Sequence, residues 1–434
     1  MAGRLRTLKF VGLLAITASC FTPAAQKLAS TPTELNMAAG DTVSLPIVKP
    51  HQAPTSSNHA VATTSETTTG TTVKSNDPGN FDIASKLFGF IPWKTHVHVT
   101  PGAKVVVGGQ AVGIRLESKG PVVVGFRRLS DGSSPSARAH VQIGDMIVSI
   151  EQHAVHSSSD LQQVLRQAPQ QIHLTIQRGH TKRQLSVNVP DDGLGHRQLG
   201  LYVRDRTVGV GTLTFYDPVH HAFGALGHVI TDIDTGQRVD GSGQLYEAMI
   251  TGLKRGQIGA PGEKRGTFSS AGTQSQIGLI SENTDYGVFG SMPSAPLPYT
   301  PSSLVQVALP EQVHEGPAKM YTVVHGNKVE AFDVRVDNVA HQHSPATKSM
   351  IIKVTDPRLL AETGGIIQGM SGSPLLQDGR LIGAVTHVFV SDPTRGYGVY
   401  AMWMLQQTRD EHAVVPSFSP WLMHPAWNQP RSAV

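Results

Sequence analysis

The stretch GMSGSP at residues 369–374 places Ser371 in a tight loop with a glycine on either side, Gly369 and Gly372. A serine hydroxyl becomes a nucleophile when a base takes its proton and backbone N–H groups receive the developing negative charge. Glycines let the backbone form that pocket because no Cβ stands in the way. The same stretch also fits an ordinary Gly-Ser turn, so the surrounding sequence must decide between the two.

A candidate base precedes this loop. His228 lies in GALGHVI, residues 224–230, at the edge of an apolar strand among small side chains. A lone histidine is more often structural, but small neighbours leave room for a substrate. Histidine before serine is the order of chymotrypsin-like peptidases, whereas α/β-hydrolases place serine first. The GxSxG elbow of those hydrolases also fails here, because Ser373 takes the place of its second glycine.

Residues 198–410 read as many short strands separated by glycine and proline turns, with no regular alternation of strand and helix. Such a pattern predicts a sandwich or a pair of barrels and disfavours a doubly wound parallel sheet. We therefore predict a mainly β protein whose peptidase domain is a chymotrypsin-like double β-barrel. The expected strands are Val208–Phe215, Gln276–Ile280, Met320–Val324, Val329–Val336, Met350–Val354, Leu381–Phe389 and Val399–Met402.

Residues 105–190 show a different order of elements. Val105–Val107 and Val122–Val124 predict strands, and a short helix, a Gly144-Asp145 turn and an apolar strand follow. A second helix is expected from Asp160, which can cap it. This order resembles a bacterial PDZ domain; the alternative is a small β-rich domain without a ligand.

In PDZ domains an extended peptide adds to a sheet edge while backbone N–H groups hold its terminal carboxylate. The resemblance implies that Val112, Gly113 and Ile114 form this loop and edge strand. The expected partner is a peptide or the C-terminus of a protein.

Four stretches together are similar to the stage IV sporulation protein B family, the PDZ-bearing serine peptidases of endospore-forming bacteria. They are GTLTFYDP (211–218), ALGHVITD (225–232), GIIQGMSGSP (365–374) and GAVTHVFV (383–390). The similarity extends over about 95–408, with a further short stretch at 34–46.

The resemblance implies His228 as general base and Ser371 as nucleophile, with Ser373 as the competitor inside the motif. The N–H groups of Gly369 and Ser371 would form the oxyanion hole. Met370 stands where related loops carry an aspartate, so an ordering ion pair is missing. Asp356 is the implied triad acid, and four other aspartates compete with it: Asp232, Asp234, Asp285 and Asp337.

Substrate recognition is expected along Thr386, His387 and Val388, an edge strand that would pair with the substrate backbone. Gly364 and Gly365, ahead of the nucleophile, include no acid. We therefore expect no trypsin-like pocket for arginine or lysine.

Composition excludes several other classes. The 434 residues carry a net charge of +4 with scattered basic side chains, which disfavours nucleic-acid binding. A single cysteine, Cys20, excludes CxxC sites, and HExxH is absent. We expect neither a metal nor a cofactor.

The remaining segments precede and follow these domains. Residues 1–26, basic and then apolar, predict a signal peptide or membrane anchor; an acylated Cys20 is the alternative. A short N-terminal segment (27–50), a disordered Thr/Ser-rich linker (51–80) and lead-in strands (81–104) are expected before the PDZ domain. Residues 411–434, with four prolines, predict a loose tail.

The resemblance implies an exported serine endopeptidase acting between mother-cell and forespore membranes and held at the membrane by its N-terminus. It would cleave a membrane-bound regulatory protein and so release an intramembrane protease that activates a late mother-cell sigma factor. It also implies self-cleavage near the N-terminus. The alternative is a non-catalytic PDZ scaffold or envelope binding protein.

Overall fold

The computed structural model describes residues 33–45, 55–56, 62–67, 70–75, 77–87, 91–100, 102–191, 197–268, 275–294, 304–340, 342 and 344–408. The predicted export segment, 1–26, and the predicted tail, 411–434, lie outside these residues. Within the described part of the protein, no helix is long and apolar enough to cross a membrane. The protein forms two compact units: the first contains residues 1–105, 304–314 and 379–382, and the second contains the rest.

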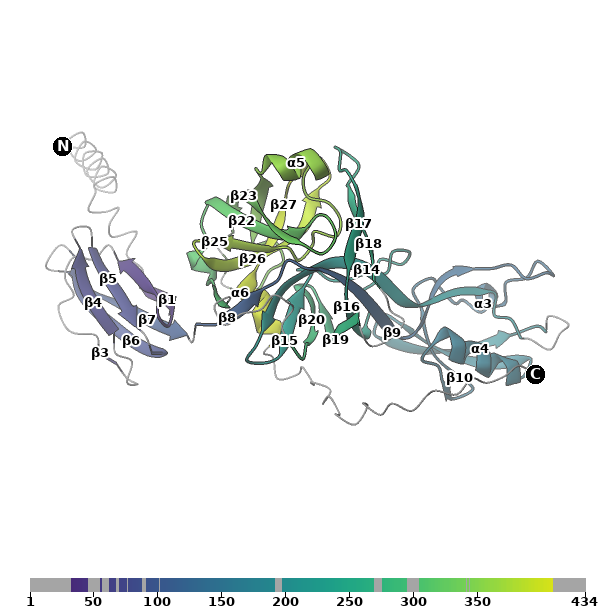
Figure 1. Cartoon of the computed structure of the whole chain (residues 1–434). Helices are drawn as coiled ribbons and strands as arrows, with labels where there is room; N and C mark the ends of the chain where they lie inside the picture. The colour runs from purple at the N-terminus through teal and green to yellow at the C-terminus, as the bar shows by residue number, and fades with distance from the viewer. Residues whose placement is uncertain are drawn as a thin grey trace, which may run out of the picture. The chain divides into compact units, whose positions relative to one another are not determined.

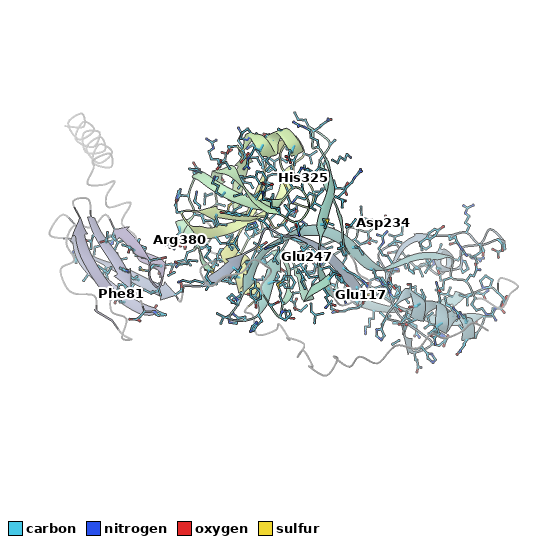
Figure 2. All side chains as sticks on the ribbon, viewed as in Figure 1. Phe81, Glu117, Asp234, Glu247, His325 and Arg380 are labelled. Atoms are coloured by element: carbon cyan, nitrogen blue, oxygen red, sulfur yellow. The ribbon has the colours of Figure 1, made fainter. Side chains whose placement is uncertain are left out.

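Two small sheets share one apolar core in the first unit. One sheet has the order β1-β7-β6-β3 and the other β2-β5-β4. Phe81, labelled in Figure 2, belongs to this core together with Met37, Val73 and Val97. The strands are β1 (Glu34–Ala38), β2 (Thr42–Leu45), β3 (Thr55–Ser56), β4 (Ala62–Thr67), β5 (Gly70–Ser75), β6 (Gly79–Leu87) and β7 (Ile91–Thr100).

The prediction of a disordered linker over 51–80 is wrong for its described parts. β5 pairs with β4 on one side and with β2 on the other. Val73 in β5 is fully buried, and Thr71 and Ser75 are buried with it. Threonine and valine are strong strand formers, so pairing on both edges orders a segment whose composition alone suggests a linker.

Six strands close the first barrel of the second unit. The ring runs β9-β16-β19-β20-β15-β14 and returns to β9. Leu116, Phe215, Phe223 and Phe289 fill its interior and are at most 1% exposed. The strands are β9 (Ala111–Phe126), β14 (Leu201–Asp217), β15 (Ala222–Ala225), β16 (Gly241–Glu247), β19 (Gln276–Thr284) and β20 (Gly287–Ser291).

The second barrel follows in sequence. β22 pairs with β23 and β25, β23 with β24, β24 with β27, and β27 with β26. Alternation along β23 buries Phe332, Val334 and Val336. The strands are β22 (Gly316–Val323), β23 (Val329–Val339), β24 (Met350–Val354), β25 (Pro374–Gln377), β26 (Arg380–Phe389) and β27 (Asp392–Tyr400). The strand predicted at Val399–Met402 is wrong in its second half, because helix α6 (Ala401–Gln407) begins there and buries Trp403 and Met404.

The domain predicted to be a PDZ domain is built between β9 and β14 rather than before the predicted peptidase domain. Figure 1 shows these long strands continuing from the first barrel toward α3, α4 and β10. Glu117, labelled in Figure 2, faces Arg206 where the paired strands leave the barrel. The first barrel therefore includes residues that precede the PDZ domain. Val105–Val107, expected in the PDZ domain, belongs instead to β8 (Lys104–Val107), which pairs with Phe215 and Tyr216 of β14.

This inserted domain has its own apolar core, which includes Ile147, Ile172 and Leu174. Its further elements are α3 (Pro135–Arg138), β10 (Met146–Ile150), β11 (His153–Ala154), α4 (Ser158–Gln167), β12 (Gln171–Arg178) and β13 (Thr181–Asn188). The expected cap of the second helix is wrong by three residues. Ser157 caps α4 by accepting a hydrogen bond from the Asp160 N–H, while the Asp160 carboxylate accepts one from the His156 N–H.

Candidate active site

The loop that carries Ser371 connects α5 (Pro357–Thr363) to β25 and is held by the first barrel. The Thr212 hydroxyl donates to the Gly369 carbonyl at 2.8 Å, and the Thr214 hydroxyl donates to the Gly372 carbonyl at 2.8 Å. The Thr212 N–H donates to the Ser371 carbonyl at 3.0 Å. β14 thus fixes the loop at three points.

Gly372 brings the serine loop against the segment that precedes His228. Its φ is +90°, and a Cβ built there would lie 2.1 Å from the Thr212 carbonyl oxygen and 2.4 Å from the Leu226 nitrogen. Leu226 and Gly227 both have positive φ, 68° and 70°. Leucine rarely adopts this conformation, so the surrounding contacts must impose it. The turn ends β15 and sets the backbone direction at His228.

One cavity of about 500 Å³ collects most of the residues predicted for the site. Gly369, Ser371, His228 and the predicted edge residues Thr386, His387 and Val388 all line it. Its walls also carry Ile114, Val208, Ile366, Ile367 and Val390. None of the described residues that line it is an aspartate or a glutamate.

A backbone carbonyl orients the His228 ring. Nδ1 lies 2.8 Å from the Val229 carbonyl oxygen, which can only accept, so Nδ1 carries the proton. In the neutral ring Nε2 then keeps its lone pair and is the basic nitrogen. Burial lowers the pKa of His228, so the ring is neutral at pH 7. The His387 ring lies beside it, with ring centroids 4.9 Å apart, and burial likewise lowers the pKa of His387.

The Ser371 hydroxyl is in the cavity but faces the edge strand. Its Oγ donates to the Thr386 carbonyl at 2.9 Å. No hydrogen bond joins the N–H groups of Gly369 and Ser371 to any other described residue, so both remain available to an oxyanion. Ser373, the competing serine, is fully buried and donates to the Thr322 hydroxyl, which leaves Ser371 as the accessible hydroxyl of the motif.

The structure does not bring Asp356 to His228. Asp356 is the N-cap of α5, and its carboxylate accepts from the N–H groups of Arg358 at 2.9 Å and Asp333 at 3.2 Å. The Arg358 guanidinium donates to it at 2.9 Å and holds its pKa at about 2. Asp356 does not line the cavity. The expected triad acid is therefore corrected to a helix cap, because a residue before proline at a helix start satisfies the free N–H groups there.

The competing aspartates have other positions as well. Asp232 and Asp234 both pair with Arg204, and Asp337 pairs with Arg335 and Arg395. Asp285 lies in the turn between β19 and β20, and none of the four lines the cavity.

The predicted peptide-binding strand of the PDZ domain is also wrong. Val112, Gly113 and Ile114 lie within the first barrel, where they pair with β14 on one side and with β16 on the other. A strand with both edges paired has no free N–H and C=O groups to add a peptide. Ile114 contributes instead to the wall of the cavity that contains Ser371.

Sequence reasoning missed residues that position the site. Thr212 and Thr214 hold the serine loop. The GTLTF motif that contains them indicated the family, but it did not predict a role for either hydroxyl group. Asn283 bonds both the N–H and the carbonyl of Ile230, each at 2.8 Å, and so holds the segment after His228. No pattern in the sequence distinguishes Asn283 from other polar residues.

Family models agree with this architecture. Residues 195–405 match the model described as SpoIVB peptidase S55, and residues 111–189 match that of the PDZ domain. No curated protein matches the sequence. Among solved structures, the Rv3671c protease from M. tuberculosis in its active form is 16% identical, with a TM-score of 0.29 over 48% of this protein and 77% of that one. An inactive serine-to-alanine mutant of the same protein is 14% identical, with a TM-score of 0.25 over 47% of this protein and 84% of that one.

Proposed function

This protein belongs to the SpoIVB peptidase S55 family of serine proteases and has a PDZ domain, and from that premise we propose that it cleaves a membrane-bound regulatory protein during sporulation. The cut would trigger intramembrane proteolysis that activates a late mother-cell sigma factor. Family membership supports this role, and the apolar cavity containing Ser371 and His228 supports the chemistry.

The proposed reaction uses Ser371 as nucleophile and His228 as base. The Ser371 side chain turns from the Thr386 carbonyl to Nε2 of His228, which takes its proton as Oγ attacks the peptide carbonyl carbon. The N–H groups of Gly369 and Ser371 receive the negative charge on the carbonyl oxygen. The protonated imidazole then gives its proton to the leaving amine, and water hydrolyses the acyl-enzyme by the same steps.

The single observation that carries this assignment is the bond from Nδ1 of His228 to the Val229 carbonyl. It fixes the tautomer that a general base needs, a task that an aspartate performs in a Ser-His-Asp triad. A neutral carbonyl stabilises an imidazolium less than a carboxylate does, so we expect slow turnover, as suits a protease that makes one regulatory cut.

We propose that the substrate backbone lies along residues 386–388 of β26. The register of β26 against β27 shifts between Val385 and His387, and the Thr386 carbonyl faces the Ser371 hydroxyl. Valine and isoleucine side chains form much of the cavity wall, with Val208 and Val390 more than half exposed. Apolar side chains next to the cleaved bond fit this wall best, since its described residues include no acid to pair with lysine or arginine.

A PDZ domain suggests a peptide ligand, which we propose to be the protein substrate or a polypeptide terminus. Export, membrane attachment through residues 1–26 and action between the two membranes are further parts of the proposal, as is self-cleavage near the N-terminus. They rest on the basic-then-apolar start of the sequence and on the family.

A fluorophosphonate probe tests the chemistry directly. We expect an adduct on Ser371 in the wild-type protein and none in Ser371→Ala, with labelling by His228→Ala slowed by several orders of magnitude. Intact mass of the wild type beside Ser371→Ala would show self-cleavage as a shortened polypeptide in the wild type only. A folded wild type that takes no label would instead indicate a non-catalytic PDZ scaffold.

A further inference from the structure

Lys264 is a fully enclosed amine close to the serine loop. It lies in β18 (Glu263–Thr267), which pairs with β17 (Met249–Lys254), and it is 3% exposed. Its Nζ donates to the Thr322 hydroxyl at 2.7 Å. Among the described residues it has no carboxylate partner, although a buried ammonium normally requires one.

Lys264 contacts the serine loop at both ends. At the near end, its N–H donates to the Gln368 carbonyl at 2.9 Å, and a Cβ on Gly369 would lie 3.0 Å from the Lys264 Cβ. At the far end, the Ser373 hydroxyl donates to the same Thr322 oxygen at 2.9 Å that accepts from the Lys264 amine. The stem of the lysine therefore supports Gly369, and its amine is linked through Thr322 to Ser373.

We propose that Lys264 is a positioning residue that shapes the oxyanion loop, and that it does so as a neutral amine. The proposal rests on the function proposed above for Ser371. Met370, in the middle of the loop, is fully buried and has no charge, so it cannot order the loop through an ion pair. The loop instead rests on an apolar stem and a chain of two hydroxyl groups.

The surroundings of Lys264 favour the uncharged form. Thr322 reaches it from β22, Ser373 from the loop and the Gln368 carbonyl from the segment before it; none is charged. Glu263 and Arg265, its neighbours on β18, are exposed. Burial alone, with no charged partner, lowers the pKa of Lys264 to about 7. Protonation would leave N–H groups of a buried ammonium unpaired, which costs free energy that movement of the loop can relieve.

The test is the pH dependence of fluorophosphonate labelling, in which the Ser371 Oγ–P bond forms, fluoride leaves and the Oγ proton passes to His228. In the wild type we expect the rate to rise with pH around a midpoint near 7, the pKa of Lys264. Lys264→Met keeps the stem and removes the proton site, so the midpoint should fall, because only His228, whose pKa is lowered by burial, then titrates. Lys264→Arg, charged at every pH, should lose roughly 10²–10³-fold in rate, as from loss of one oxyanion donor.

Lys254→Met, which removes an exposed lysine from β17, is the matched control and should leave the midpoint unchanged. If Lys264→Met does not fold, Thr322→Val replaces it, because loss of the acceptor lowers the pKa of the amine and should also lower the midpoint. A folded variant with the wild-type midpoint would overturn the inference and leave the proposed function standing. A folded wild type that takes no label at any pH would overturn both.

Discussion

At the residue scale, the site depends on glycine, whose lack of a Cβ lets two backbone segments approach each other closely. The loop that presents Ser371 meets the turn before His228 at Gly372, where the backbone atoms of two distant segments occupy the space of a Cβ. The positive φ of Leu226 in the facing turn shows how closely the segments are held. The close approach of the serine loop to the turn that precedes His228 thus requires a residue without a Cβ at position 372.

Gly372→Ala should separate the two segments. We expect fluorophosphonate labelling to fall by at least roughly 10²–10³-fold, the usual effect of a displaced oxyanion donor, together with a lower melting temperature. Gly379→Ala is the control, because Gly379 also has a positive φ, +74°, but has nothing within 4 Å of a Cβ. Gly379→Ala should lower stability by only about 1–2 kcal/mol, because alanine is strained in the left-handed backbone conformation. This variant should be labelled at the wild-type rate. Equal labelling of both variants would contradict this account.

The burial of Lys264 should also make the free energy of unfolding depend on pH. Its pKa falls from an ordinary 10.5 to about 7 on folding, so between these values the unfolded state binds more protons. The free energy of unfolding should therefore rise with pH across this window, by up to about 1.4 kcal/mol per pH unit. Urea denaturation should find Lys264→Met more stable than the wild type near pH 7, with the difference shrinking toward about pH 10. A stability difference that does not change with pH would argue against a buried amine.

At the scale of elements, the same local sequence serves different purposes according to its neighbours. Val112-Gly113-Ile114 reads as a PDZ edge strand, yet β14 and β16 pair with both of its edges. Asp356 reads as a candidate triad acid, yet it caps α5 and pairs with Arg358. For β9 the partners are distant strands, whereas for Asp356 they are mainly the adjacent N–H and guanidinium groups of Arg358.

Substitution of Asp356 distinguishes a cap from a catalytic acid. Asparagine caps helices as well as aspartate does, so Asp356→Asn should label at nearly the wild-type rate. Loss of a triad acid would instead cost roughly 10⁴-fold in turnover. Asp356→Ala should lower stability by about 1 kcal/mol through loss of the cap, measured by urea denaturation. A large rate loss in folded Asp356→Asn would restore the triad assignment.

At the scale of the whole molecule, the PDZ domain interrupts the first barrel instead of preceding it. β9 enters the PDZ domain from the barrel and β14 returns from it, and the two strands pair along most of their length. Because the PDZ domain has a separate apolar core, the two bodies share a pair of strands and not a flexible linker.

This insertion predicts the outcome of two truncations. Replacing residues 118–205 by a two-residue Asn-Gly turn joins Glu117 to Arg206, which already face each other, and suits a tight hairpin. We expect this shortened protein to fold and to label at Ser371. The fragment 198–410, cut at the boundary that the sequence predicts, lacks β9 and should not fold, as judged by circular dichroism. A folded, reactive 198–410 fragment would show that the first barrel does not need β9.

Sequence patterns alone were enough to predict the mainly β class, a PDZ domain, a serine peptidase domain and the motifs around Ser371 and His228. These follow from local patterns: strand periodicity, glycine at turns and short motifs of defined chemistry. The pairing of β9 on both edges, the strands within residues 51–80 and the burial of Lys264 beneath the loop became clear only from the fold. Each of these features depends on which distant segments supply hydrogen-bond partners or exclude water. The spacing of residues in the sequence does not encode these long-range contacts.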